Sequence, residues 1–381
     1  MKQNRVLLGE YVTEYSVKNK ANEDIPVYSV TNSQGFCTEY FDKEVASKDK
    51  TTYKIVPRGY FAYNPSRINV GSVDWQKSAD RVIVSPLYNV FSVSDELDQQ
   101  YLFYFLKSDI GRQMIKAKSS GSVRDNLKMD MLKEMTIPKR TLQEQKECVA
   151  ILDKLKRIIS LQEEKIEKYD KLVKARFVEM FGDPAVNDKG WKTKPLLDLG
   201  KCKNGMNFRY DDSGVEINCL GVGDFKNLSI IDDTQKLPTV ALKEMPSEEY
   251  LLKDEDIVFV RSNGNKDLVG RCLVVYPGNL PTTFSGFCIR YRKYDKEIAV
   301  SYLLRVLKME SMRRKMTGRG ANIQNLNQQI LGTLVIPIPP IELQNQFSDF
   351  TQAIDKSKVA VQKALDKAQL LFDSLMQQYF G

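Results

Sequence analysis

The segment that decides the fold occurs twice in the chain. Its first copy reads TIPKRTLQEQ at residues 136–145, and its second reads PIPPIELQNQ at residues 337–346. Pro138 and Gln145 match Pro339 and Gln346, each at an offset of 201 residues. Similar segments at one offset indicate a repeated structural unit.

Further matches extend the repeat in both directions. The matching pairs are Tyr101-Leu102 with Tyr302-Leu303, Asn126-Leu127 with Asn325-Leu326, and Phe181-Gly182 with Phe380-Gly381. The first pair has an offset of 201 residues and the other two have an offset of 199. Insertions in loops produce such small shifts, so the chain consists of two copies of one unit of about 200 residues.

A long helix is predicted at the end of each unit. Apolar residues recur there at spacings of three, four or seven, and neither Gly nor Pro interrupts the interior, which is the pattern of a coiled-coil seam. We expect the seam to consist of Leu152, Leu155, Ile159, Ile166, Tyr169, Val173 and Phe177 in the first helix, and of Phe350, Ile354, Val361, Leu365, Phe372 and Leu375 in the second. At 1.5 Å per residue each helix is about 60 Å long, and the two are expected to pair in antiparallel directions.

The parts that precede the helices have the composition of mixed globular domains. Apolar runs of strand length, such as residues 82–84 and 256–260, are broken by Gly, Pro and Asn. The predicted fold class is α+β, with two pseudo-repeated mixed α/β globular domains separated by two long helices that form an antiparallel coiled coil. The expected boundaries are 1–138 for the first globular domain, 139–183 for the central spacer helix, 184–338 for the second globular domain and 339–381 for the C-terminal spacer helix.

Composition narrows the possible chemistry. The chain has 57 Lys and Arg against 49 Asp and Glu, a net charge of +8, which suits an anionic partner without requiring one. It has no histidine, which excludes Ser-His-Asp catalysis and His-ligated zinc. None of the six cysteines forms a C-x-x-C pair, so we expect buried, reduced thiols in the cytoplasm and no metal site. No run of 18 apolar residues predicts a membrane span.

Known enzyme motifs are absent or incomplete. There is no G-x-x-x-x-G-K-[ST] phosphate loop, and residues 221–223 hold a lone G-x-G. Asn64-Pro65 is followed by Ser66-Arg67 and not by the proline and aromatic residue of an adenine methyltransferase motif. The acidic runs at 163–164 and 254–256 are typical of a helix face and of a turn. We therefore expect no catalytic residue in this chain.

Two polar clusters recur in both units. The first follows a predicted strand, where Arg and Asn side chains could hydrogen-bond to the edges of bases, although the same residues are common in solvated turns. Its candidate DNA-binding residues are Tyr63, Asn64, Ser66 and Arg67 in the first unit and Arg261, Ser262, Asn263, Asn265 and Lys266 in the second.

The second cluster lies upstream of each long helix. Basic residues beside a loop rich in small and polar residues suit contacts to phosphate, although basic residues also favour the C-terminal ends of helices. Its candidates are Lys116, Lys118, Ser120, Ser122 and Arg124 in the first unit and Arg313, Arg314, Arg319, Asn322 and Gln324 in the second.

The order of these parts resembles the DNA-specificity subunit of type I restriction–modification systems. The resemblance rests on the pattern Ile-Pro-x-x-x-Leu-Gln-x-Gln, on the helix end RFVEMFGDP at residues 176–184, and on the loops at 61–69 and 260–264. It covers essentially the whole chain.

The resemblance implies a role for each part. Each globular domain would read one half of a bipartite target in double-stranded DNA, and the helices would set the gap between the halves and dock two modification subunits. S-adenosylmethionine would be bound by the modification subunits, and ATP and Mg by restriction subunits. This chain would itself bind no cofactor. Two alternatives stay open: a stand-alone sequence-specific DNA-binding protein, and a DNA-processing enzyme that depends on carboxylates.

Overall fold

The computed structural model describes residues 4–38, 49–119, 126–208, 214–225, 229–294, 297–317 and 325–381. The chain divides into two compact units. Unit 1 comprises Met1–Lys165 together with Val361–Gly381, and unit 2 comprises Ile166–Ala360. This division passes through the middle of both long helices, whereas the four segments expected from the sequence keep each helix whole. That four-segment division therefore stays a prediction.

Unit 1 contains one four-stranded antiparallel sheet in the order β2-β9-β6-β7 and three two-stranded sheets, β1-β10, β3-β4 and β5-β8. The strands are β1 (Arg5–Leu7), β2 (Val12–Glu14), β3 (Ser29–Thr31), β4 (Gly35–Cys37), β5 (Lys54–Pro57), β6 (Phe61–Tyr63), β7 (Val73–Trp75), β8 (Arg81–Val84), β9 (Asn89–Val93) and β10 (Thr136–Pro138). The helices before the long one are α1 (Gln99–Lys107), α2 (Asp109–Ser119) and α3 (Met129–Lys133).

Unit 2 contains a five-stranded sheet in the order β12-β19-β16-β17-β14, a three-stranded sheet in the order β15-β13-β18, and the pair β11-β20. The strands are β11 (Lys192–Pro195), β12 (Gly200–Asn204), β13 (Val215–Leu220), β14 (Ile230–Ile231), β15 (Thr239–Leu242), β16 (Asp256–Val260), β17 (Cys272–Val275), β18 (Thr282–Phe284), β19 (Cys288–Lys293) and β20 (Val335–Ile338). The short helices are α5 (Val300–Lys308), α6 (Glu310–Thr317) and α7 (Gln328–Gly332).

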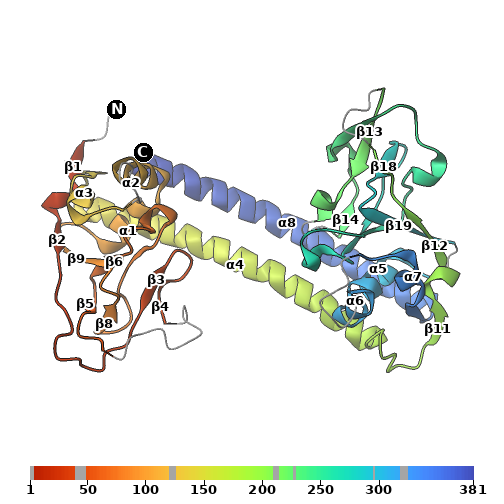
Figure 1. Cartoon of the computed structure of the whole chain (residues 1–381), viewed down its shortest axis with the longest axis horizontal. Coiled ribbons are helices and arrows are strands. Elements are labelled where there is room, and N and C mark those ends of the chain that lie inside the picture. The colour runs from red at the N-terminus through yellow and green to blue at the C-terminus, as the bar shows by residue number, and fades with distance from the viewer. Residues whose placement is uncertain are drawn as a thin grey trace. The chain divides into compact units, whose positions relative to one another are not determined.

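The two units repeat one topology. The order β2-β9-β6-β7 in unit 1 corresponds to β12-β19-β16-β17 in unit 2, and β1-β10 corresponds to β11-β20. Three short helices follow the last strand of the main sheet in each unit, and a long helix follows them. The predicted α+β fold with an internal repeat is thus confirmed (Figure 1).

The long helices are α4 (Leu142–Phe181) and α8 (Ile341–Phe380). A capping box begins α4, because Glu144 accepts a hydrogen bond from the Thr141 backbone N–H at 2.7 Å and the Glu144 N–H donates to the Thr141 hydroxyl at 3.3 Å. Gly182, at a φ of 75°, ends α4 and donates its N–H to the Val178 carbonyl oxygen at 2.8 Å. Local hydrogen bonds therefore fix both ends of α4.

The helices contact each other within each unit. In unit 1 the first half of α4 and the second half of α8 meet at one core, to which Leu152 belongs and against which Phe372 and Leu375 pack. In unit 2 the second half of α4 and the first half of α8 meet at Phe177 and Phe347, whose ring centroids are 5.4 Å apart. The helices therefore run in opposite directions. The thirteen predicted seam residues lie on the buried or half-buried side of their helices.

A buried glutamine corrects the register of the repeat. Gln145 accepts from the Asp98 N–H at 2.8 Å and donates to two backbone carbonyls. Gln344 makes the same three kinds of bond, accepting from the Ala299 N–H at 2.8 Å. Gln145 thus corresponds to Gln344 at an offset of 199, and not to the exposed Gln346. The 201-residue alignment slipped by two residues because Ile-Pro occurs twice in succession at residues 336–339.

The end of each long helix completes one core. Phe181 lies 4.7 Å from the Tyr302 ring centroid in unit 2, and Phe380 lies 5.0 Å from that of Tyr101 in unit 1. Donors from the first strand region of each unit satisfy the helix ends, because the Trp191 indole donates to the Phe181 carbonyl and Arg5 donates to that of Phe380. Each globular core is therefore closed by the last turn of a long helix.

Candidate nucleic-acid interface

The first polar loop, residues 64–72, leaves β6 and is folded by its own side chains. Asn64 Oδ1 accepts from the Ser66 N–H at 3.1 Å and from the Ser66 hydroxyl at 2.9 Å, which forms an Asx turn. Gly71 closes the loop at a φ of 96°, and a Cβ there would lie 2.3 Å from Asn32 Oδ1. The loop presents Ser66 and Arg67 at its exposed edge.

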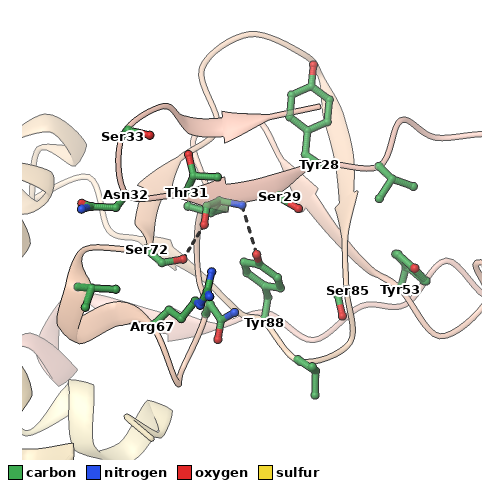
Figure 2. A pocket seen from close by; sticks show the side chains of 15 residues that line it. Tyr28, Ser29, Thr31, Asn32, Ser33, Tyr53, Arg67, Ser72, Ser85 and Tyr88 are labelled. Carbon is green, nitrogen blue, oxygen red and sulfur yellow. Dashed lines mark hydrogen bonds between the residues drawn. The ribbon is translucent and has the colours of Figure 1, made fainter. Parts of the chain in front are cut away.

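A cavity of about 450 Å³ lies beside this loop. Asn64 and Arg67 line it together with residues of β3 and of the segment that leads into β9. Figure 2 shows Ser72 and Tyr88 reaching the same stretch of β3, where the Ser72 hydroxyl donates to the Val30 carbonyl at 2.6 Å and the Val30 N–H donates to the Tyr88 hydroxyl at 3.4 Å. These bonds hold the loop and the cavity wall in one arrangement.

Lys107 of α1 supports the same loop. Its ammonium group donates to the Asn32 carbonyl at 3.3 Å and to the Gly71 carbonyl, and it lies 5.5 Å from the centroid of the Phe103 ring. Burial lowers the pKa of Lys107. Because its hydrogen bonds go to backbone carbonyls of the loop region, Lys107 is a positioning residue.

The second polar loop, residues 261–271, has the same place in unit 2. Asn263 Oδ1 accepts from the Asn265 N–H at 2.8 Å, and Asn265 Oδ1 accepts from the Asp267 N–H at 3.0 Å. Gly270, at a φ of 76°, precedes β17 as Gly71 precedes β7. A cavity of about 520 Å³ adjoins this loop and is lined by residues that include Ser262 and Asn263.

In both units the polar loop is hydrogen-bonded to a residue just before the third short helix. The Leu127 N–H donates to the Pro65 carbonyl at 3.1 Å, and the Leu326 N–H donates to the Arg261 carbonyl at 2.8 Å. Asn325 also forms an isolated β-bridge with Ser262. The described residues just before the third short helix, Leu127 in unit 1 and Asn325 and Leu326 in unit 2, therefore lie against the polar loop.

The basic residues at the ends of α2 and α6 differ in their surroundings. Lys116 and Arg314 are exposed, and Arg314 lies 3.3 Å from Glu310. Lys118 lies 2.7 Å from Glu134. Ion pairs at the surface contribute only about 0–1 kcal/mol, so these side chains can exchange their partners for phosphate.

Two candidates need correction. Tyr63 is fully buried, donates its hydroxyl to the Leu127 carbonyl at 3.1 Å and accepts from the Asn89 amide at 2.9 Å. Burial raises its pKa. Both faces of β6 are buried: Phe61 and Tyr63 belong to one apolar cluster of unit 1 and Ala62 to another, so Tyr63 cannot reach DNA.

Arg313 is the second correction. Its guanidinium donates to the carbonyls of Asp267, at 3.1 Å, and Val269, at 3.4 Å, both within the second polar loop. Arg313 Nε is buried and has no acceptor among the described residues. Arg313 is half-buried, and its guanidinium holds the second polar loop in place, a role that was not predicted for it.

The remaining candidates fall into two groups. Arg261 is half-buried and donates to the Gly286 carbonyl at 3.4 Å, whereas Asn265 and Lys266 are exposed. The candidates outside the described residues are Ser120, Ser122, Arg124, Arg319, Asn322 and Gln324.

Two residues at these sites were not predicted. Leu87 lines the first cavity and is 76% exposed, and Phe287 lines the second and is 61% exposed. In the sequence, Leu87 stands next to Tyr88 and Phe287 next to Cys288, both of which are buried, so nothing in the pattern marks Leu87 and Phe287 as exposed.

The described residues offer little reactive chemistry. Burial raises the pKa of Cys202 and Cys219 to about 12 and that of Cys272 to about 11, so these thiols stay neutral at physiological pH. Within the described ranges, no group of His, Cys, Asp and Glu side chains is arranged to hold a metal ion. No helix in the same ranges has the length and apolarity needed to cross a membrane.

Comparison with known proteins gives consistent results. The family model for the type I restriction modification DNA specificity domain matches residues 9–169 and, again, residues 188–370. The StySPI specificity subunit of Salmonella potsdam is 26% identical over 302 residues, which is 74% of this chain and 64% of that protein, somewhat less than two thirds of its length. The MjaVIII specificity subunit of Methanocaldococcus jannaschii is 24% identical over 87% of this chain and 82% of its own length.

Solved structures share the fold. One, described as the structural basis of complex assembly and conformational transition of a type I R-M system, has a TM-score of 0.61 at 14% identity and covers 100% of this chain and 98% of its own. The S subunit of the type I system from M. genitalium has a TM-score of 0.57 at 16% identity and covers 100% of this chain and 97% of its own.

Proposed function

The chain belongs to the type I restriction–modification DNA specificity family, as its motifs predict, and we propose that it is the sequence-reading subunit of such a complex. Each globular domain reads one half of a bipartite target in double-stranded DNA. The polar loops at residues 64–72 and 261–271 supply the contacts to bases, and Lys116, Lys118 and Arg314 supply contacts to phosphate.

One observation carries this proposal: the same loop site is built twice from different residues. In both units a glycine in the left-handed region closes the loop, and a leucine N–H ties it to the following segment. The exposed polar side chains differ, because they are Ser66 and Arg67 in one unit and Asn265 and Lys266 in the other. A backbone frame that recurs in both units and carries different hydrogen-bonding groups suits the reading of two different half-sites.

The remaining roles rest on the family. The long helices set the gap between half-sites and dock two modification subunits, and restriction subunits join the complex. S-adenosylmethionine, ATP and Mg are bound by those partners in the cytoplasm, and this chain is noncatalytic. The scattered acidic residues, the neutral thiols and the missing histidine are consistent with a subunit that directs the chemistry of others.

A domain exchange tests the reading role. Residues 1–138 are replaced with the first domain of a relative of known specificity, and methylated adenines are mapped in cells that also make the modification subunit. We expect one half-site to change while the other half-site and the gap stay the same. A change in both half-sites would contradict the proposal.

The isolated chain separates the alternatives. Without modification subunits we expect no adenine methylation and no DNA cleavage, whether or not Mg is added. Methylation or cleavage by the purified chain would favour a carboxylate-dependent enzyme. Tight binding to one DNA sequence without any partner would favour a stand-alone DNA-binding protein.

A further inference from the structure

Leu87 and Phe287 occupy corresponding positions in the two units. The Leu127 N–H donates to the Pro65 carbonyl, and the Leu326 N–H donates to the Arg261 carbonyl, so Pro65 and Arg261 are equivalent positions of the two units. Tyr63 and Phe259, two residues earlier in each unit, are then equivalent as well. Tyr63 pairs in register with Asn89, and Phe259 pairs with Ile289. Leu87 and Phe287 each lie two residues before these partners, so the internal repeat places them at one site in the shared frame.

Both side chains are exposed. A single exposed apolar side chain is common on protein surfaces and needs no explanation. Here, however, the sequence of the loop changes between the units while the apolar, exposed character of this one position does not: Leu87 is 76% exposed and Phe287 is 61% exposed. The repetition indicates that the exposed apolar group has a use.

Each residue stands beside hydrogen-bonding groups. Leu87 shares its cavity with Asn64 and Arg67, and Phe287 shares its cavity with Ser262 and Asn263.

The backbone fixes Phe287 against its loop. The Phe287 carbonyl accepts from the Arg261 N–H at 2.8 Å and from the Ser262 N–H at 3.4 Å, and the Phe287 N–H donates to the Ser285 hydroxyl at 3.3 Å. Because the N–H and the carbonyl of Phe287 are both hydrogen-bonded, the backbone that holds its ring is fixed. A preorganised apolar group loses little entropy on binding.

We propose that Leu87 and Phe287 are specificity-determining residues, each packing against the C5-methyl group of a thymine in the half-site that its domain reads. This inference rests on the proposed function. In the major groove the thymine methyl is the apolar feature of a base-pair edge, while the neighbouring features are donors and acceptors suited to Arg, Asn and Ser. An apolar side chain set among such polar groups is complementary to that edge.

The test uses the complex assembled with its modification subunits and a duplex that carries the target found by methylation mapping. Each thymine of a half-site is replaced in turn with deoxyuridine, which removes only the methyl group, and affinity is measured by fluorescence anisotropy. The wild-type complex is expected to lose about fourfold in affinity at one thymine, as burial of one methyl predicts.

The variants then assign that loss to a residue. Phe287→Ala should weaken binding and abolish the thymine-to-uridine difference at one position of the half-site read by residues 184–338, with no change in the other half-site. Leu87→Ala should do the same in the half-site read by residues 1–138. Tyr294→Ala is the matched control, because Tyr294 is 62% exposed and follows the other end of β19, and it should leave every thymine-to-uridine difference unchanged.

The outcomes distinguish this inference from the function on which it rests. If the wild-type complex binds no bipartite target, the proposed function fails. If it binds one but Phe287→Ala and Leu87→Ala keep the thymine-to-uridine differences, or if a half-site lacks thymine in both strands, only this inference is overturned. Size-exclusion chromatography checks that each variant still assembles with its modification subunits. A variant that loses these subunits but keeps its thymine-to-uridine difference would likewise overturn this inference.

Discussion

Replacement of Gln344 by leucine tests the buried glutamine that sets the register of the repeat. The side chain is fully buried, accepts from the Ala299 N–H at 2.8 Å, and donates to the carbonyls of Glu297 at 3.2 Å and Pro339 at 2.8 Å. Leucine has a similar volume but makes none of these bonds. At about 1 kcal/mol for each lost bond, the free energy of unfolding should fall by about 3 kcal/mol, and by more if the Ala299 N–H stays without an acceptor.

Urea unfolding followed by far-UV circular dichroism measures the loss. With a slope of about 2 kcal/mol per molar urea, the midpoint of the unfolding transition should fall by about 1.5 M. Gln346→Leu is the matched control, because Gln346 is exposed two residues further along α8 and should change stability by less than about 0.5 kcal/mol. Equal effects of the two substitutions, or a larger effect at Gln346, would refute the 199-residue register and the role of the buried amide.

Three further predictions concern other parts of the chain. Asp256 is fully buried and accepts two 2.7 Å hydrogen bonds from the Arg292 guanidinium. Asp256→Ala removes this carboxylate, so calorimetry should show that unit 2 is destabilised by about 3–5 kcal/mol. A loss below about 1 kcal/mol would contradict this. Burial raises the pKa of Cys272 from 9.0 to about 11, so its contribution to stability is complete below pH 9 and is lost as the pH rises to about 11. Cys272→Ala should therefore flatten the dependence of the unfolding free energy on pH across that range. An unchanged pH profile would contradict this role of the Cys272 thiol. Insertion of four residues after Ile159 and after the corresponding Lys358 lengthens both helices by about 6 Å and should widen the gap in the methylated target while both half-sites persist; altered half-sites with an unchanged gap would contradict the spacer role.

Sequence periodicity was sufficient for the long helices. The spacing of Leu152, Leu155 and Ile159 identifies a buried side because a helix repeats every 3.6 residues whatever surrounds it, and Gly182 marks the end because its φ of 75° suits few other residues.

The candidate interface was less predictable. The alternation along a three-residue strand is too short to show that Tyr63 points inward, and no local pattern shows that Arg313 reaches carbonyls of a loop some 45 residues earlier. The roles of Leu87 and Phe287 could not be predicted, because the exposure of an apolar residue depends on the tertiary fold. The loop positions themselves could be predicted, since repetition within the chain marks them twice.

The division of the long helices between two cores affects the order in which the protein folds on the ribosome. Unit 2 is one continuous stretch, Ile166–Ala360, whereas unit 1 needs Val361–Gly381 to cover Tyr101 and Phe105 with Phe380. At about 5–20 residues per second, the first domain waits on the order of 10–40 s for this segment after its own residues have been made. The domain that is translated first therefore completes its core last. Until then its uncovered aromatic residues can be bound by chaperones and the incomplete domain can be cleaved by proteases.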